Sequence, residues 1–411
     1  MRILVLTNLL PPVSEGGYEK RCGRVVRHLR SRHDVRVLTT DRHAERHAGD
    51  AAVVPVLPWM TPTRADAWRT PGQSHQAAKA TRRVLTAFRP ELVYIWNITN
   101  VPQSALAVIL QSRVPVALNI GEYWLERLYG DGEPFMRRLL EPTHGVRKVA
   151  KAALKAYNSV DPALRLRPEE GRPVGISWIT EHLRRATTVP TYVAPLVEEV
   201  TLPFSPHADA FAGIERRTAE PPTFLFAGRV TEDKGVDVAI RALAKLVEER
   251  PAARLLVAGT ATDEMRSSLT ALAGSLGLEP QAVTFLGNLE AHDLRERIAT
   301  CRAMLVPSVW DEPGGLVCLD SAVAGIPLVA AAVGGIPELV RDEEHALLFP
   351  RSDAARCAQL MLRVLDEPDA TAAMVERARR RAAELSEDRY LAADDDFRER
   401  VVAAYAEAVG R

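Results

Sequence analysis

A chain of 411 residues is longer than one hydrophobic core usually supports, so its length predicts two domains of about 200 residues each. With 47% hydrophobic and 26% charged residues, the composition is that of a globular protein and excludes disordered, collagen-like and disulfide-scaffold classes. The net charge is zero, but residues 1–200 contain 29 Lys and Arg against 19 Asp and Glu, and the remainder carries the opposite excess. One explanation of this asymmetry is a basic face that binds an acidic acceptor or an anionic membrane. The other is general solvation together with attraction between the two halves, and we favour this second explanation.

We do not expect the N-terminal residues to act as an export signal. Residues 1–6 lack the long apolar stretch and the small-residue cleavage site of a secretory signal. The longest apolar stretch, 326–336, is too short to span a bilayer and contains Pro327. The cysteines have neither paired spacing nor nearby histidine clusters; they are Cys22, Cys301, Cys318 and Cys357. We therefore expect a cytoplasmic protein with reduced thiols, no transmembrane helix and no metal site.

Strands and helices alternate in the first half of the chain. Residues 2–7 predict a buried strand, followed by a loop with Gly16-Gly17, a helix that ends near Arg32, and a second strand at 35–39. This order predicts a parallel sheet with right-handed crossovers. The other elements predicted in this half are strands at 92–96, 114–118 and 175–178 and a charged helical insertion at about 125–157.

The pattern breaks at residues 201–222, a stretch with Pro, Ala and His that ends at Pro221-Pro222. After it the alternation restarts, with strands at 223–226, 254–258, 283–285 and 303–306 and a helix at 236–249. The fold class is therefore α/β, with two Rossmann-like doubly wound domains. The expected boundaries are 1–203 for the first domain, 204–385 for the second, and 386–411 for a helix that crosses back to the first.

A cationic loop follows the strand at 223–226, at the edge where open α/β sheets bind ligands. Residues 226–235 read Phe-Ala-Gly-Arg-Val-Thr-Glu-Asp-Lys-Gly. Gly228 lets the backbone approach a ligand, and Arg229 and Lys234 supply two cations to a diphosphate without a metal. An ordinary surface turn fits this motif alone equally well.

A glycine-rich turn follows the strand at 303–306 and precedes a helix. Free N–H groups at the start of such a helix can face phosphate or sugar oxygens. Glu312 precedes this helix and Asp320 lies inside it, eight positions later, which suits binding of two parts of one elongated ligand. The alternative is a capping acid and a solvated acid. Neither Gly-x-Gly-x-x-Gly nor Gly-x4-Gly-Lys-Ser/Thr occurs, which argues against a nicotinamide-dependent dehydrogenase and a P-loop enzyme.

Together, these segments resemble the retaining glycosyltransferases of family 4, which have the GT-B fold and whose donor domain carries a Gly-Arg…Lys-Gly loop and a Glu-x7-Glu motif. The Gly16-Gly17 loop and the Ala-Gly-Ile-Pro-Leu-Val run at 324–329 also fit, so the resemblance covers nearly the whole chain. It implies two domains that face a central cleft, and a nucleoside-diphosphate sugar as co-substrate, with no other cofactor.

The resemblance also implies roles for individual residues. Arg229 and Lys234 would bind the donor diphosphate, and Glu312 would accept hydrogen bonds from the transferred sugar; these three form the expected catalytic set. Asp320 would hold the ribose, at a position where the family has Glu. The other donor-binding residues that it implies are Gly16, Gly17, Gly228, Asn288, Leu289, Gly314, Gly315, Leu316 and Val317.

A second departure from the family lies in the first domain. Many members have a His-Asp pair after the strand that corresponds to 116–119, whereas here Gly121 and Glu122 stand at those positions. Either the departing phosphate oxygen takes the acceptor proton, or the protein is catalytically inactive; the complete donor motif favours the first. Gly121 would then make room for a bulky acceptor, in a pocket with Asn97, Glu122 and Trp124. Structural roles for these residues fit equally well.

The acceptor itself is not specified by these motifs. It is a small natural-product precursor, a growing polysaccharide or a lipid; the many Arg and Ala residues are typical of high-GC bacteria and favour the first. A non-catalytic nucleotide-sugar-binding partner protein is the remaining alternative. We expect no nucleic-acid partner and do not favour peripheral membrane contact.

Overall fold

The computed structural model describes residues 1–13, 16–60, 70–127, 173–190, 193, 195–217 and 219–410. The chain forms two compact units. Unit 1 contains Met1–Ile179, Leu183–Leu202 and Leu391–Arg411, and unit 2 contains Thr180–His182 and Pro203–Tyr390. The long segment of unit 2 thus begins one residue before the expected boundary at 204, and the chain returns to unit 1 at Leu391, five residues after the expected boundary at 386. Most of the expected helical insertion at 125–157 lies outside the described residues.

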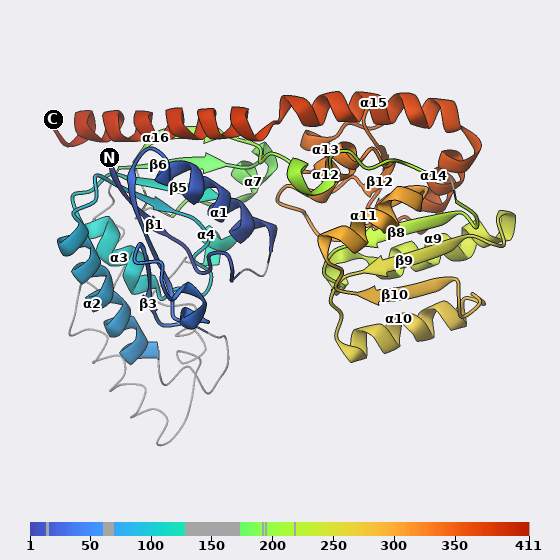
Figure 1. Ribbon diagram of the computed structural model, residues 1–411, viewed down its shortest axis with the longest axis horizontal. Coiled ribbons are helices and arrows are strands. Elements are labelled where there is room, and N and C mark those ends of the chain that lie inside the picture. The colour runs from blue at the N-terminus through green and yellow to red at the C-terminus, as the bar shows by residue number, and fades with distance from the viewer. Residues whose placement is uncertain are drawn as a thin grey trace, which may run out of the picture. The chain divides into compact units, whose positions relative to one another are not determined.

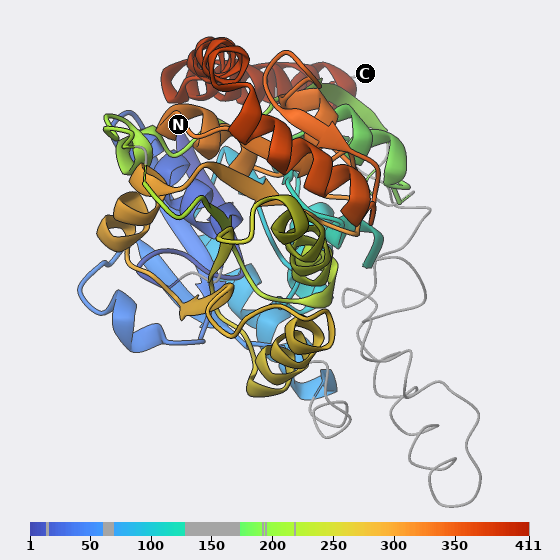
Figure 2. The same ribbon diagram turned by 90° about the vertical axis from the view of Figure 1, so that its right-hand side faces the viewer.

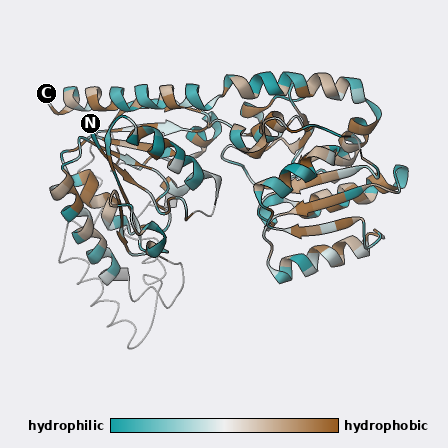
Figure 3. Ribbon diagram, in the orientation of Figure 1, coloured by the Kyte–Doolittle hydropathy of each residue, from teal (hydrophilic) through white to brown (hydrophobic). Residues whose placement is uncertain are grey.

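Unit 1 is built on a parallel sheet that has, in the described ranges, seven strands in the order β3-β2-β1-β4-β5-β6-β7. Val5 of the central strand β1 lies between Val37 of β2 and Tyr94 of β4. Helices cover both faces of such sheets, so the central strands β1, β4 and β5 are nearly continuous apolar runs; Figure 3 colours each residue by its hydropathy. The strands are β1 (Arg2–Leu6), β2 (Asp34–Thr40), β3 (Val53–Leu57), β4 (Leu92–Ile95), β5 (Val116–Ile120), β6 (Val174–Trp178) and β7 (Leu196–Thr201).

The helices of unit 1 connect these strands (Figure 1). Helices α2 and α3 pack against each other, and α2 also contacts β3. The described helices are α1 (Gly17–Arg30), α2 (Thr70–Phe88), α3 (Gln103–Gln111), α4 (Trp124–Arg127), α7 (Glu181–Ala186, in unit 1 from Leu183), α16 (Glu387–Val409, in unit 1 from Leu391) and the 3₁₀ helix η1 (Ala44–His47).

Unit 2 repeats this architecture on a second parallel sheet, with the strand order β10-β9-β8-β11-β12-β13 over the described residues. Leu225 of the central strand β8 lies between Leu256 of β9 and Met304 of β11. The strands are β8 (Thr223–Ala227), β9 (Arg254–Ala258), β10 (Val283–Gly287), β11 (Ala303–Val306), β12 (Leu328–Ala331) and β13 (Leu347–Phe349).

Helices α9 and α14 of unit 2 pack against each other, as Figure 2 shows from the side of this unit. No helix in the described ranges has both the length and the apolar character needed to cross a membrane. The helices of unit 2 are α8 (Ala208–Phe211), η6 (Glu232–Lys234), α9 (Val236–Glu249), α10 (Asp263–Ser275), α11 (Ala291–Thr300), α12 (Val317–Ala324), α13 (Ile336–Leu339), α14 (Ala354–Asp366) and α15 (Pro368–Glu384).

Every strand that the sequence predicts is present, and the described residues form four further strands that were not predicted. Three of them, β3, β7 and β13, lie at the ends of their sheets. Edge strands tolerate residues that central strands exclude, such as Pro55 in β3 and Glu198-Glu199 in β7. The fourth, β12, lies inside the apolar stretch 326–336 and follows Pro327 directly.

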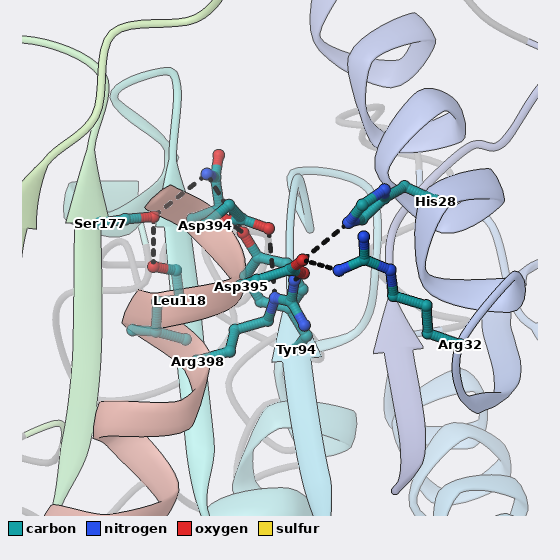
Figure 4. Close-up of polar contacts among 9 residues, drawn as sticks. His28, Arg32, Tyr94, Leu118, Ser177, Asp394, Asp395 and Arg398 are labelled. Atoms are coloured by element: carbon teal, nitrogen blue, oxygen red, sulfur yellow. Dashed lines mark hydrogen bonds and ion pairs between the residues drawn. The ribbon is translucent and has the colours of Figure 1, made fainter. Parts of the chain in front are cut away.

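Helix α16 docks on unit 1 through a buried polar cluster (Figure 4). The Tyr94 hydroxyl donates to Asp394 Oδ1 at 2.5 Å, and Arg398 Nε donates to Asp394 Oδ2 at 3.1 Å. Asp395, the next residue, contacts His28 at 2.8 Å and Arg32 at 2.9 Å. Burial raises the pKa of the Asp394 carboxyl. Asp394 and Arg398 are at most 1% exposed, so their charges need compensation within the cluster, where Arg398 pairs with both Asp394 and Asp395.

Candidate active site

The order of strands in unit 2 reverses between β8 and β11, which are neighbours in the sheet although β9 and β10 separate them in the chain. In open α/β sheets, ligands bind outside the carboxyl ends of the strands at such a point. The loops after β8 and β11 carry the two sequence motifs, and they are bonded to each other: the N–H of Val309 donates to the carbonyl of Asp233 at 2.9 Å.

Lys234 and Glu312 form an ion pair across these two loops. Lys234 Nζ lies 2.7 Å from Glu312 Oε1, and their side chains are 18% and 9% exposed. The Ser308 hydroxyl donates to the same oxygen at 2.6 Å, and Lys234 Nζ also lies 5.1 Å from the centroid of the Trp310 ring. Among the described residues, nothing donates to Glu312 Oε2, so this oxygen can accept a hydrogen bond from a ligand.

Arg229 lies on the same loop as Lys234 but is exposed. Its guanidinium makes no hydrogen bond or ion pair with any residue in the described ranges. An unpaired guanidinium offers its full set of donors to a planar or tetrahedral anion. Within the described part of the chain, the loop after β8 therefore presents one paired cation, Lys234, and one unpaired cation, Arg229.

The backbone of Glu312 is fixed by the Gly334-Gly335 pair, which sequence reasoning did not assign to the site. Gly334 has φ +55°, and a Cβ there would collide with the backbone of Glu312. The N–H of Gly335 donates to the carbonyl of Glu312 at 2.7 Å. The carbonyl of Pro313, the next residue, accepts from the Thr180 hydroxyl at 2.5 Å. The only sequence signal for this support was the Gly-Gly dipeptide.

The N-terminus of α12 carries free backbone donors. Gly315, with φ +68°, and Leu316 lead into the helix, whose first residue is Val317. The N–H groups of these three residues donate to no acceptor within the described ranges. Gly314 precedes them and is buried. Because the positive end of the helix dipole points the same way, this terminus favours an anion.

Asp320 lies in the first turn of α12, about one turn beyond these amides. Its carboxylate accepts a hydrogen bond from the backbone N–H of His207 at 2.7 Å and also contacts the His207 ring. Sequence reasoning did not include His207 in the site, and no motif marks it.

The remaining expected donor residues of unit 2 follow strands β8 and β10, which lie on either side of β9 in the sheet. Gly228 follows β8, and its N–H donates to the carbonyl of Ala258 at the end of β9. Asn288 follows β10 and is exposed, while Leu289 packs partly against the core. All of these positions lie at the carboxyl edge of the sheet that also carries Lys234.

The expected residues of unit 1 lie after β1, β4 and β5, and the strand order of this sheet reverses between β1 and β4. The loops after these two strands are bonded, because the N–H of Asn8 donates to the carbonyl of Asn97 at 2.6 Å. The Asn97 side chain is already engaged: it donates to Glu19 at 3.1 Å and accepts from the N–H of Thr99 at 3.0 Å. Asn97 therefore organises this loop.

Gly16 and Gly17 begin helix α1. Gly16 is extended and caps the helix, and Gly17 is its exposed first residue. Their N-terminal neighbours, 14 and 15, lie outside the described residues. The two glycines thus lie at the start of a helix, beside the point where the strand order of the sheet in unit 1 reverses.

The space beside Gly121 is filled by Tyr18 of α1. A Cβ on Gly121 would lie 2.7 Å from the Tyr18 ring, so a side chain at 121 and this ring exclude each other. The Tyr18 hydroxyl donates to the carbonyl of Asn119 and accepts from the N–H of Gly121 at 3.2 Å. Burial raises the pKa of Tyr18 well above its ordinary value, so the phenol stays protonated. The expected room for an acceptor at Gly121 is therefore occupied by the protein itself.

Besides Asn97, the expected acceptor residues are Glu122 and Trp124, and their side chains differ in exposure. Trp124 is 2% exposed, and its Nε1 donates to the Tyr18 hydroxyl at 3.4 Å, so it is part of the Tyr18 cluster. Glu122 is exposed. Of the three expected acceptor residues, Glu122 alone presents its side chain at the surface of the described unit.

Comparison with known families agrees with this arrangement. Residues 209–381 match the family of glycosyl transferases group 1, and residues 16–154 match the glycosyl transferase 4-like domain. A D-inositol 3-phosphate glycosyltransferase of Salinispora arenicola is 31% identical over 308 residues, which are 69% of this chain and 68% of that protein. The chain belongs to the group 1 glycosyltransferases.

This chain aligns with only part of the length of the glycosyltransferases that resemble it in sequence. It is 36% identical to an uncharacterized glycosyltransferase of Methanocaldococcus jannaschii over 129 residues, which are 31% of this chain and 32% of that protein. It covers 46% and 61% of the D-inositol 3-phosphate glycosyltransferases of Streptomyces coelicolor and Saccharomonospora viridis, respectively. The chain thus spans about one third to two thirds of the curated relatives that it matches.

Solved structures show that this group 1 glycosyltransferase has the GT-B fold. The sucrose-phosphate synthase of Thermosynechococcus elongatus superposes with a TM-score of 0.71 at 17% identity, over 98% of this chain and 99% of that chain. HepE of Anabaena, solved in complex with UDP-glucose, superposes with a TM-score of 0.63 at 16% identity, over 100% and 99%. The fold predicted from the sequence, with two Rossmann-like domains, is confirmed.

Proposed function

We propose that this group 1 glycosyltransferase moves a sugar from a nucleoside-diphosphate sugar to an acceptor, with retention of the anomeric configuration and without a metal ion. The observation that supports this most strongly is the Lys234–Glu312 ion pair. It lies where the strand order of the sheet in unit 2 reverses, next to the free backbone amides that begin α12. The complex of HepE with UDP-glucose supports a nucleotide sugar as donor.

In the proposed reaction, the bond between the anomeric carbon and the diphosphate oxygen breaks, and the acceptor oxygen bonds to the same face of the sugar. Arg229, Lys234 and the amides of 315–317 would stabilise the charge that develops on the leaving diphosphate. An ammonium has three donors, so Lys234 can keep its bond to Glu312 while it binds phosphate. Glu312 Oε2 would accept a hydrogen bond from a sugar hydroxyl.

The acceptor proton needs a destination, because Gly121 supplies no base. In a displacement on one face of the sugar, the departing phosphate oxygen lies beside the incoming hydroxyl and takes its proton. Tyr18 does not serve as this base, since it stays protonated and already donates to Asn119. We propose that this substrate-assisted route replaces the histidine of other members.

Lys234→Ala tests the donor site. We expect kcat/KM to fall by at least about 100-fold, the usual effect of removing one preorganised charge from a leaving group. Lys234→Gln, which keeps a donor for the buried Glu312, should show a similar loss with less effect on folding. Lys245→Ala is the matched control, because Lys245 is exposed on α9 and has no partner among the described residues. Normal turnover by both Lys234 variants would contradict the proposal.

A non-catalytic nucleotide-sugar-binding protein is the second candidate function. The observation that favours it is Tyr18, which fills the space where other members have the histidine. To decide between the two, the pure protein would be incubated with UDP-, GDP- and ADP-glucose and the release of nucleoside diphosphate measured. Release above that of the Lys234→Gln variant excludes the non-catalytic candidate, and binding without release supports it.

For the acceptor, we propose a small natural-product precursor, on the basis of the Arg- and Ala-rich composition. The alternatives are a polysaccharide and a lipid. Assays with small polar aglycones, soluble oligosaccharides and lipid vesicles, each with the donor that is turned over, distinguish the three classes. Transfer to vesicles or oligosaccharides alone would contradict this part of the proposal.

A further inference from the structure

The Asp320 carboxylate is held from one side by a single residue, His207. The backbone N–H of His207 donates to Oδ1 at 2.7 Å. The ring Nδ1 lies 2.9 Å from Oδ2 and 3.2 Å from Oδ1, so it carries its proton toward the carboxylate. Both oxygens therefore receive a donor from the same residue, 113 positions away in the chain.

His207 is itself held firmly in unit 2. It directly precedes α8, which packs against α12, the helix of Asp320. Phe204 and Ser205 lie just before it and are buried, and the Phe204 ring contacts the Tyr390 ring at 5.6 Å between centroids. Because the backbone on both sides is packed, the donors of His207 have a fixed direction.

The chain has Asp at 320, where the family it resembles has Glu. The Asp side chain is one methylene shorter, so its carboxylate ends about 1.5 Å closer to the helix. A shorter carboxylate can still bind a ligand hydroxyl if its orientation is fixed in advance, because less rotational freedom is then lost on binding. A carboxylate has about four lone-pair sites, and His207 leaves some of them unused. The Asp320 side chain is 13% exposed, so an outward site remains accessible.

We propose that His207 is a positioning residue, which fixes the short Asp320 carboxylate so that it accepts a hydrogen bond from a ribose hydroxyl of the donor. This inference rests on the proposed function, because the ribose belongs to the nucleotide of that donor. It assigns a role to a residue outside both motifs, and it makes residues 207 and 320 one functional unit.

Binding measurements with ribose analogues test the inference. The affinities of the full chain for UDP, GDP, ADP and CDP would be measured by titration calorimetry, each beside its 2′,3′-dideoxy form. For the nucleotide that binds, we expect the wild type to prefer the ribose form by about tenfold or more, the usual worth of a hydrogen bond to a charged group. His207→Ala should remove most of this preference and leave the affinity for the dideoxy form nearly unchanged. A merely structural role would weaken both forms by the same factor.

A compensating substitution provides the second arm. In the His207→Ala background, Asp320→Glu restores the longer side chain, which reaches the ribose without support, so the preference should return. In the wild-type background, Asp320→Glu should lower the preference, because the longer side chain collides with His207. His292→Ala is the matched control, since His292 is 84% exposed on α11. It should change neither affinity.

Each outcome has a definite meaning. Equal weakening of ribose and dideoxy forms by His207→Ala overturns the inference, as does a double variant that fails to recover the preference. In both cases nucleotide binding by the wild type still supports the proposed function. If none of the four nucleoside diphosphates binds the wild type, the proposed function and the inference both fall.

Discussion

At the scale of single residues, Gly121 and Tyr18 depend on each other. Gly121→Ala places a methyl group 2.7 Å from the Tyr18 ring, so we expect a loss of about 1–3 kcal/mol in the free energy of unfolding. Gly274→Ala is the control, because Gly274 lies in α10 and a methyl group added there would meet no atom within 4 Å among the described residues. There Ala should stabilise by up to about 1 kcal/mol. Urea unfolding of both variants measures the two changes in the free energy of unfolding. Equal changes would show that the Tyr18 ring can move aside at little cost.

The Tyr18 hydroxyl is a separate test. Tyr18→Phe removes the donor to the Asn119 carbonyl and the acceptor of the Gly121 N–H, and both groups are buried. We expect a loss of about 1–3 kcal/mol in the free energy of unfolding. Nucleoside-diphosphate affinity should change little, because the expected cationic ligands Arg229 and Lys234 belong to unit 2 and the substitution leaves the backbone of Gly16 and Gly17 in place. A large change in affinity would mean that Tyr18 takes part in donor binding.

At the scale of elements, α16 depends on its buried ion pair. Asp394→Ala removes one of the two carboxylates that pair with the buried Arg398 and leaves only Asp395, so we expect a loss of about 1.5–3 kcal/mol in the free energy of unfolding. Asp396→Ala is the matched control on the same helix, since Asp396 is 63% exposed and its pair with Arg400 lies at the surface. It should cost less than about 1 kcal/mol. Thermal unfolding compares the two; similar melting temperatures would show that the buried pair contributes little.

The central elements were predictable because each has a strong local signal. The strands β8, β9 and β11 each contain four consecutive apolar residues, and α9 has a regular apolar face. The edge strand β7 lacks this signal, because charges such as Glu198-Glu199 are tolerated where a strand has a neighbour on one side only, whereas the edge strand β10 was predicted from its apolar residues. For the last helix, the sequence predicted its presence at 386–411, but the buried Asp394 and Arg398 of α16 could not be distinguished from surface charges.

The candidate site was predictable to the extent that it lies next to strand ends. Arg229, Lys234 and Glu312 follow strands that meet at one edge of the sheet, and the motifs marked them. His207 and Tyr18 could not be found in this way, because their contacts join positions 113 and 103 residues apart and no motif includes either. Their roles follow from tertiary packing, which spacing along the chain does not reveal.

At the scale of the whole molecule, unit 1 needs the last segment of the chain. Residues 391–411 belong to this unit, and they bury Phe397, Val401 and Tyr405 together with the Asp394–Arg398 pair. A chain that ends at residue 390 should therefore lose amide-exchange protection in β4, β5 and β6, whereas β8 and β11 should keep theirs. Hydrogen exchange read by mass spectrometry checks this. Unchanged protection of β4–β6 would show that unit 1 is stable without α16.

The assignment of residues 391–411 to unit 1 also bears on synthesis at the ribosome. Apart from residues 180–182, unit 2 is one continuous stretch from Pro203 to Tyr390, so it can fold as soon as that stretch has emerged. Unit 1 begins to emerge first but is completed last, because Tyr94 must wait some 300 residues for Asp394. During that interval its sheet lacks α16, and the nascent chain exposes the apolar surface that the helix later covers. The first unit to be translated is thus the second to finish folding.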